Sequence, residues 1–252
     1  MIKPVRDDIS KWTLSYKVDK KNTYLSSSLE KKQVFAASCG ACALLVAAKE
    51  LGIDDMSMVP SIYSEFTGGK LELTNECELD LYQITSGFTS YRRQSSDINK
   101  AGYSMPQNIM LACKLLGIEC EITENRCFFS KSLSWIYPEV RKQCEGIGCQ
   151  IKQETSDDAD KLKIKAMVVS SASTAGIPAG LHWVLSRPDG SFMDPGVGKN
   201  SLNFNELINN AKEIVRGIKY FDSGISIVLS MPKHKTISEP VESPCRSALN
   251  FV

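Results

Sequence analysis

The residues from Cys39 to Gly52 have the types and order that a nucleophilic thiol needs. The segment opens with a cysteine and a glycine and continues as small and apolar residues that favour a buried helix. A thiol in the first turn of a helix meets the partial positive charge of the helix N-terminus, which favours the reactive thiolate. We therefore predict that Cys39 is a nucleophile, and that other segments supply a base, an acid that orients the base, and a hydrogen-bond donor for an oxyanion.

A base for this thiol must be one of only two histidines. His234 lies in a Pro-Lys-His-Lys sequence near the C-terminus, where a solvated histidine is expected. His182 lies between Leu181 and Trp183, in an apolar segment that is predicted to form a strand. We predict that His182 is the base; the alternative is a histidine that is packed in the strand for structural reasons.

The turn after this strand brings an acid to His182. Pro188–Gly190 suits a three-residue hairpin loop, with a type I turn on the proline and the aspartate and a left-handed glycine. In that register Val184 faces Asp194, and His182 is the diagonal neighbour of Asp194 on the same face, about 7–8 Å away at the backbone. A two-residue loop would place the two side chains on opposite faces. Asp194 is therefore predicted to orient the imidazole; alternatively, it only begins the Asp-Pro-Gly turn.

An oxyanion donor is predicted at Gln33, six residues before Cys39. From that distance the side-chain amide can point into the same cleft as the thiol. It would share the oxyanion with the backbone N–H at the start of the helix. The alternative for a lone glutamine is an ordinary surface position.

Composition limits the class of protein. The chain has 252 residues, of which 42% are hydrophobic and 23% charged, and a formal net charge of +1. This balance argues against a nucleic-acid-binding surface, and no apolar run approaches the roughly 20 residues of a membrane span. The first residues have no apolar core of a secretory signal, and nine irregularly spaced cysteines favour reduced thiols in a cytosolic setting.

The order of the predicted elements is helical first and sheet-rich second, which indicates an α+β fold with one catalytic domain. Residues 1–32 are predicted to be a polar N-terminal arm, 33–230 the catalytic domain and 231–252 a loose C-terminal tail. Besides the helix after Cys39, the patterns predict helices at Val59–Phe66, Pro106–Gly117 and Phe204–Val215, the start of a helix within Trp135–Val140, and a weak helix or strand at Leu79–Ile84. Strands are predicted at Ile118–Ile122, Ile164–Ser170, Leu181–Ser186, Ser191–Met193 and Ile225–Leu229.

The whole pattern, Gln-x5-Cys-Gly before a buried helix and a distant His-Trp-Val strand followed by Asp-Pro, resembles the papain-like cysteine hydrolases. That resemblance implies a helical part carrying the cysteine helix, packed on a C-terminal antiparallel sheet that carries the histidine and the aspartate. It also implies a triad of Cys39, His182 and Asp194, assisted by Gln33, with no cofactor and no metal.

Two bacterial branches are similar in more detail. One is the bacteriocin-leader-processing peptidases, in which Cys-Gly opens the helix. The other is the papain-fold effector toxins, including glutamine deamidases, which carry Cys-x-x-Cys-Ala-Leu on the helix and His-Trp on the strand. In this chain the latter residues are Cys39, Cys42, Ala43, Leu44, His182 and Trp183. The papain signature Cys-Gly-Ser-Cys-Trp would instead align its nucleophile with Cys42, although Ala43 departs from the aromatic residue expected there.

The function predicted from these residues is thiol-dependent amide hydrolysis by a cysteine peptidase that acts on a protein or peptide. The resemblance adds a bacterial effector that acts on a host protein, located in the cytoplasm or exported into a host cell without a cleaved signal peptide. Deamidation of a glutamine side chain is one alternative, because it uses the same steps on a different amide. A thioredoxin-like redox pair of Cys39 and Cys42 is another, although it gives no role to Gln33, His182 or Asp194.

Overall fold

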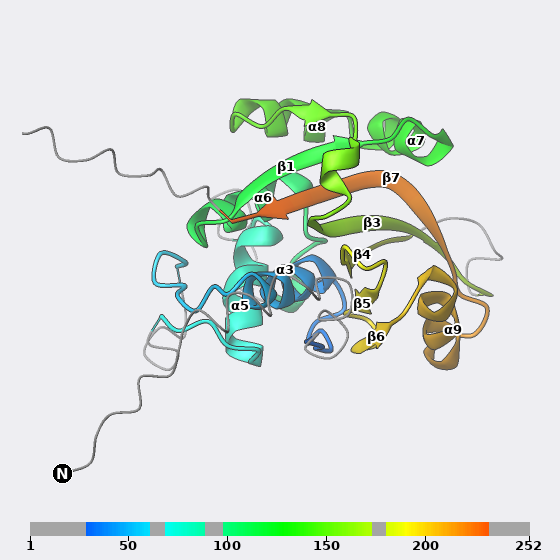
Figure 1. Cartoon of the computed structure of the whole chain (residues 1–252), viewed down its shortest axis with the longest axis horizontal. Coiled ribbons are helices and arrows are strands. Elements are labelled where there is room, and N and C mark those ends of the chain that lie inside the picture. Colours follow the sequence, from blue (N-terminus) through cyan, green and yellow to red (C-terminus); the bar gives the residue numbers. More distant parts are fainter. Residues whose placement is uncertain (1–28, 61–68, 89–97, 173–179, 232–252) are drawn as a thin grey trace, which may run out of the picture.

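The computed structural model describes residues 29–60, 69–88, 98–172 and 180–231 (Figure 1). The helices are α3 (Cys39–Glu50), α5 (Asn75–Thr85), η1 (Ile98–Lys100), α6 (Pro106–Leu115), α7 (Phe128–Ile136), α8 (Pro138–Gly146), η2 (Ser156–Asp158) and α9 (Phe204–Ile214). The strands are β1 (Glu119–Glu124), β2 (Ile151–Lys152), β3 (Leu162–Ser170), β4 (Gly180–Ser186), β5 (Phe192–Asp194), β6 (Lys199–Ser201) and β7 (Lys219–Ser230).

One seven-stranded sheet, in the order β2-β1-β7-β3-β4-β5-β6, organises the second half of the chain. Only β1 and β2 pair in parallel, and every other neighbouring pair is antiparallel. Helices α3, α5 and α6 pack together beside this sheet, and α3 lies against β3 and β4 (Figure 1). The predicted α+β class and the papain-like division into a helical part and a sheet are thereby confirmed.

Helix α3 is buried along almost its whole length, from Cys39 to Ala48. Its small side chains let it lie deep between α5 and the sheet, as the sequence predicts. Gly40 shows how close this packing is, because a Cβ there would lie 2.5 Å from the Cβ of Ser104. A glycine after Cys39 is therefore required for the helix to begin at this place.

The hairpin of β4 and β5 has the predicted register. Leu185 pairs with Met193 and Ser186 with Phe192. The backbone N–H of Arg187 also donates to the carbonyl of Ser191 at 2.9 Å, which leaves a loop of three residues. Gly190 has a φ of +85°, the left-handed conformation that favours glycine, as expected for the last residue of this loop.

Two further segments are defined more closely by the structure. Trp135–Val140, which is predicted to begin a helix, contains the end of α7 at Ile136 and the start of α8 at Pro138. Proline cannot donate the backbone hydrogen bond of a helix interior, but it suits a first turn, so the chain breaks here. The uncertain segment Leu79–Ile84 lies within helix α5.

Several expectations fall on residues outside the described part of the chain. These are most of the proposed N-terminal arm, all but the first two residues of the predicted helix Val59–Phe66, and nearly all of the C-terminal tail. Leu29 to Lys32, by contrast, are described, and the side chain of Lys31 is buried. Within the described residues, no helix has the length and apolar character needed to cross a bilayer.

Candidate active site

Cys39 begins helix α3 at the point where that helix meets strand β4. Its side chain is 2% exposed, and the backbone N–H of Trp183 donates to Cys39 Sγ at 3.5 Å. The indole Nε1 of Trp183 donates in turn to the carbonyl of Ser104, which fixes the strand against the segment that covers Gly40. A donor aimed at the sulfur stabilises its negative form.

The His182 ring lies between Cys39 and Asp194. Its Nε2 is 2.6 Å from Asp194 Oδ1, which leaves Nδ1 as the ring nitrogen available for the thiol. Burial of the ring lowers the pKa of His182. The negative charges of Asp194 and Cys39, together with hydrogen bonds to both, outweigh the burial and raise that pKa to about 10. A ring with this pKa carries a proton at neutral pH.

Asp194 is fully buried and has three hydrogen-bond donors. Besides His182, the backbone N–H of Gly196 donates to Oδ1 at 2.8 Å and the Tyr220 hydroxyl donates to Oδ2 at 2.9 Å. Burial raises the pKa of the Asp194 carboxyl, but the positive charge of His182 and these three donors bring the pKa below its ordinary value. The carboxylate is thus held ionised and in one orientation.

Tyr220 is a site residue that the sequence analysis missed. It lies on β7, and its ring centroid is 5.6 Å from that of His182. Val169 of β3 pairs with Gly180 on one side and with Tyr220 on the other, so β3 separates the two strands. No short sequence motif predicts the contact of Tyr220 with Asp194. The contact depends on the order of β7, β3 and β4 in the sheet, which the sequence alone does not determine.

Gln33 lies beside the site, with its side chain turned toward its own loop. Its Nε2 donates to the carbonyls of Phe35 at 2.6 Å and Ala36 at 3.0 Å, and its backbone N–H donates to the carbonyl of Pro195 at 2.9 Å. The loop before Cys39 is therefore attached to the turn that follows Asp194. In this arrangement both amide protons of Gln33 are already used.

The start of α3 carries backbone donors that no side chain caps. Ser38 is the N-cap residue, but its hydroxyl makes no capping bond to the first turn. The first N–H groups of a helix have no partner within the helix, so they are available to a developing oxyanion beside Cys39.

Cys42 lies deeper in α3 than Cys39 and has different neighbours. Its thiol is fully buried and donates to the carbonyl of Lys31 at 3.4 Å. Burial, followed by the negative charge of Glu78, strongly raises the pKa of Cys42. Both cysteines are free thiols. Cys42 therefore has the character of a neutral packing residue, which favours Cys39 as the nucleophile and weakens the redox alternative.

A mainly apolar pocket of about 180 Å³ opens next to His182, between the sheet and helices α7 and α8. Apolar and aromatic side chains dominate its lining, which includes Tyr103, Met105, Pro106, Leu133, Tyr137 and Leu181.

Comparison with known proteins gives consistent matches. A family model described as "Invasion plasmid antigen J, cysteine protease" matches residues 31–232, which include Gln33, Cys39, His182 and Asp194. Among curated proteins, "Cysteine protease IpaJ" of Shigella flexneri is 42% identical over 204 residues, which cover 80% of this chain and 78% of that protein. No solved structure matches the chain.

Proposed function

The chain belongs to the invasion plasmid antigen J family of cysteine proteases, and from this premise we propose that Cys39, His182 and Asp194 hydrolyse the amide bond. The observation that carries the assignment is the position of the His182 ring. It contacts Asp194 through Nε2 at 2.6 Å and lies within hydrogen-bonding reach of the Cys39 thiol on its other side.

The reaction follows from the charges of this group. His182 holds the proton of the thiol, so the Cys39 thiolate attacks the carbonyl carbon and forms a tetrahedral oxyanion. His182 then gives that proton to the leaving amine, and a thioester with Cys39 remains. Next, His182 takes a proton from water, the hydroxide attacks the thioester, and the thiol is released. Asp194 keeps the ring oriented and stabilises its charged form in each step.

The oxyanion is proposed to bind at the first turn of α3. The uncapped backbone N–H groups there supply fixed donors next to Cys39. Gln33 is proposed as the second donor, and this role requires it to exchange the Phe35 or Ala36 carbonyl for the oxyanion. Its backbone bond to Pro195 keeps it at the site during that exchange.

We propose that the bond broken is a main-chain amide, as in the peptidase resemblance, and that an apolar group of the substrate enters the pocket beside His182. The family description, a cysteine protease, supports cleavage over glutamine deamidation. An invasion antigen in the family description and a relative from Shigella flexneri support an exported effector that acts on a host protein.

The test is digestion of a library of peptides prepared from a human cell extract. Wild-type protein and Cys39→Ala would be incubated with the library, and the products read by mass spectrometry. Cleavage predicts new peptide termini that appear only with the wild type, with apolar residues enriched near them. A mass gain of about one unit on glutamine without new termini would mean deamidation. New termini in equal yield from Cys39→Ala would contradict the proposal.

A further inference from the structure

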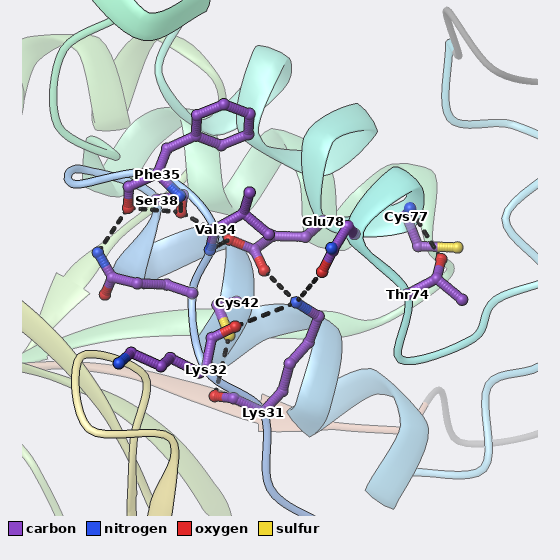
Figure 2. Close-up of polar contacts among 11 residues, drawn as sticks. Lys31, Lys32, Val34, Phe35, Ser38, Cys42, Thr74, Cys77 and Glu78 are labelled. Atoms are coloured by element: carbon purple, nitrogen blue, oxygen red, sulfur yellow. Dashed lines mark hydrogen bonds and ion pairs between the residues drawn. The ribbon is translucent and has the colours of Figure 1, made fainter.

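One buried carboxylate fastens the loop that leads into the Cys39 helix. Glu78 lies in the first turn of α5 and is fully buried. Its Oε1 accepts from the backbone N–H of Val34 at 2.8 Å and from the Ser38 hydroxyl at 2.6 Å, and its Oε2 accepts from Lys31 Nζ at 2.5 Å (Figure 2). All three donors belong to the segment just before Cys39.

Lys31 balances the charge of this carboxylate. Its side chain is 7% exposed, and its ammonium also donates to the carbonyl of Lys32 at 3.2 Å (Figure 2). A third hydrogen bond, also of 3.2 Å, runs from the ammonium to Asn75 Oδ1. Every proton of the ammonium therefore has an acceptor. A buried ion pair stabilises a fold weakly compared with apolar packing, because both charges lose their water. The main effect of the Lys31–Glu78 pair is therefore to fix the path of the loop before Cys39.

The same loop is held at its far side by the histidine half of the site. The backbone N–H of Gln33 donates to the carbonyl of Pro195, next to Asp194. Gln33 lies between Lys31 and Val34, both held by Glu78. The Gln33 amide, which is proposed to bind the oxyanion, therefore lies in a loop that Glu78 holds on one side and the Pro195 carbonyl holds on the other.

Glu78 also determines which hydrogen bonds are made by Ser38, the N-cap residue of α3. An N-cap serine usually accepts a hydrogen bond from the first turn of its helix. Ser38 instead donates to Glu78 and accepts from the backbone N–H of Phe35 at 3.1 Å, and it makes no capping bond. By drawing this hydroxyl away, Glu78 leaves the N–H groups beside Cys39 open to an oxyanion.

We propose that Glu78 is a positioning residue that holds the Lys31–Ser38 loop so that the oxyanion donors are in place before the substrate arrives. Glu78 touches neither the substrate nor the reacting atoms. The proposal rests on the proposed function of Cys39. Loss of one oxyanion donor typically lowers kcat by about 10²–10³. Displacement of the loop, with its donors retained, should cost somewhat less.

The decisive variant is Glu78→Gln in the full chain, because glutamine keeps the volume but removes the charge that orders Lys31, Val34 and Ser38. With a peptide found in the library digestion, kcat should fall about 10- to 100-fold while KM changes less than about threefold. Alkylation of Cys39 by iodoacetamide, which forms no oxyanion, should keep its rate within about twofold. A purely structural defect in the site would slow both reactions together.

Asp158→Asn is the matched control. Asp158 is equally buried, pairs with Lys161 at 3.0 Å and accepts from Thr155, all outside the loop. This variant should lower thermal stability as Glu78→Gln does, yet keep kcat. Should Glu78→Gln fail to fold, Ser38→Ala carries the test, with a smaller loss of kcat that Ser38→Thr restores.

The proposal is overturned if kcat of Glu78→Gln equals that of the wild type, or if kcat and the alkylation rate fall by the same factor. Failure of the proposed function looks different, because the wild type itself would then cleave no peptide. In that case the oxyanion site is measured by reversible addition of Cys39 to a peptide aldehyde. Binding of the aldehyde should weaken at least tenfold in Glu78→Gln and stay unchanged in Asp158→Asn.

Discussion

The two sides of this site are held in different ways. The histidine side is local: His182 and Asp194 are only 12 residues apart, on the two strands of one hairpin. The cysteine side is held over long distances, because Glu78 is 47, 44 and 40 residues from its partners Lys31, Val34 and Ser38. A turn sets the geometry of the first side, whereas a buried charge sets that of the second.

The two sides should therefore control different parts of the reaction. In the proposed mechanism the hairpin orients the group that transfers protons, so changes there should alter how the rate depends on pH. The loop would orient the groups that bind a charge formed only during the reaction, so changes there should alter kcat with the proton chemistry intact.

The largest effect is expected at Cys39, where the two sides meet. Cys39→Ala should lower kcat/KM for a cleaved peptide by about 10⁴-fold or more, because no other described thiol lies beside His182. Cys42→Ala should retain activity within about tenfold, since its thiol only fills a buried space and bonds to the Lys31 carbonyl. Steady-state rates of the two purified variants are the measurement, and the opposite ranking would contradict the assignment.

The hairpin register can be broken by removing one residue of β5. Deletion of Met193 moves Asp194 one place along the strand, opposite Leu185, so His182 and Asp194 should lie on opposite faces and the rate should fall about 10³-fold. Pro188→Ala keeps the loop length and should keep the activity within about threefold. Peptide cleavage and far-ultraviolet circular dichroism would be compared for both. An active deletion variant would show that the register does not position the acid.

Asp194→Asn separates charge from shape on the histidine side. Protonated His182 supplies the proton to the leaving amine, and its pKa of about 10 means that the wild-type rate should decline only as the pH rises through about 10. Asparagine removes the negative charge of Asp194 that raises this pKa. The basic limb should therefore move to lower pH, toward 6.5, and kcat at neutral pH should fall about 10²-fold. Profiles of kcat/KM against pH test this, and an unmoved basic limb would refute it.

Tyr220→Phe is expected to give the smallest effect. It removes one of three donors to Asp194, the bond of 2.9 Å from the hydroxyl, while His182 and Gly196 still hold the carboxylate. A single hydrogen bond contributes about 0.5–1.5 kcal/mol, so kcat should fall about 2- to 10-fold, with KM unchanged. A greater loss than in Asp194→Asn would mean that Tyr220 acts in the chemistry rather than through the acid.

The parts predicted from the sequence are those that local chemistry determines. The turn residues Pro188–Gly190 identify the hairpin register, and the small residues after Cys39 indicate the buried helix; the structure agrees with both. Tyr220 could not be predicted, because it reaches Asp194 only through the order of β7, β3 and β4.

The role proposed for Glu78 could not be predicted from the sequence for a related reason. Glu78 lies just before Leu79–Ile84, the segment predicted as a weak helix or strand, and a lone glutamate is usually solvent-exposed. Its partners Lys31 and Ser38 lie in a segment that reads as an arm and a lead-in to α3. Only tertiary packing buries the three together, and a one-dimensional pattern contains no sign of that packing.

The most direct test of the proposed Cys39–His182 pair is brief labelling with iodoacetamide at neutral pH. The site and rate of labelling would be measured by mass spectrometry of the digested protein. Cys39 should be alkylated first, because His182, its proposed base, lies within hydrogen-bonding reach of its thiol, and buried Cys42 should remain unmodified. In His182→Ala the rate at Cys39 should fall at least about tenfold. Labelling of Cys42 first, or an equal rate at Cys39 in His182→Ala, would contradict the central claim that Cys39 and His182 form the reactive pair.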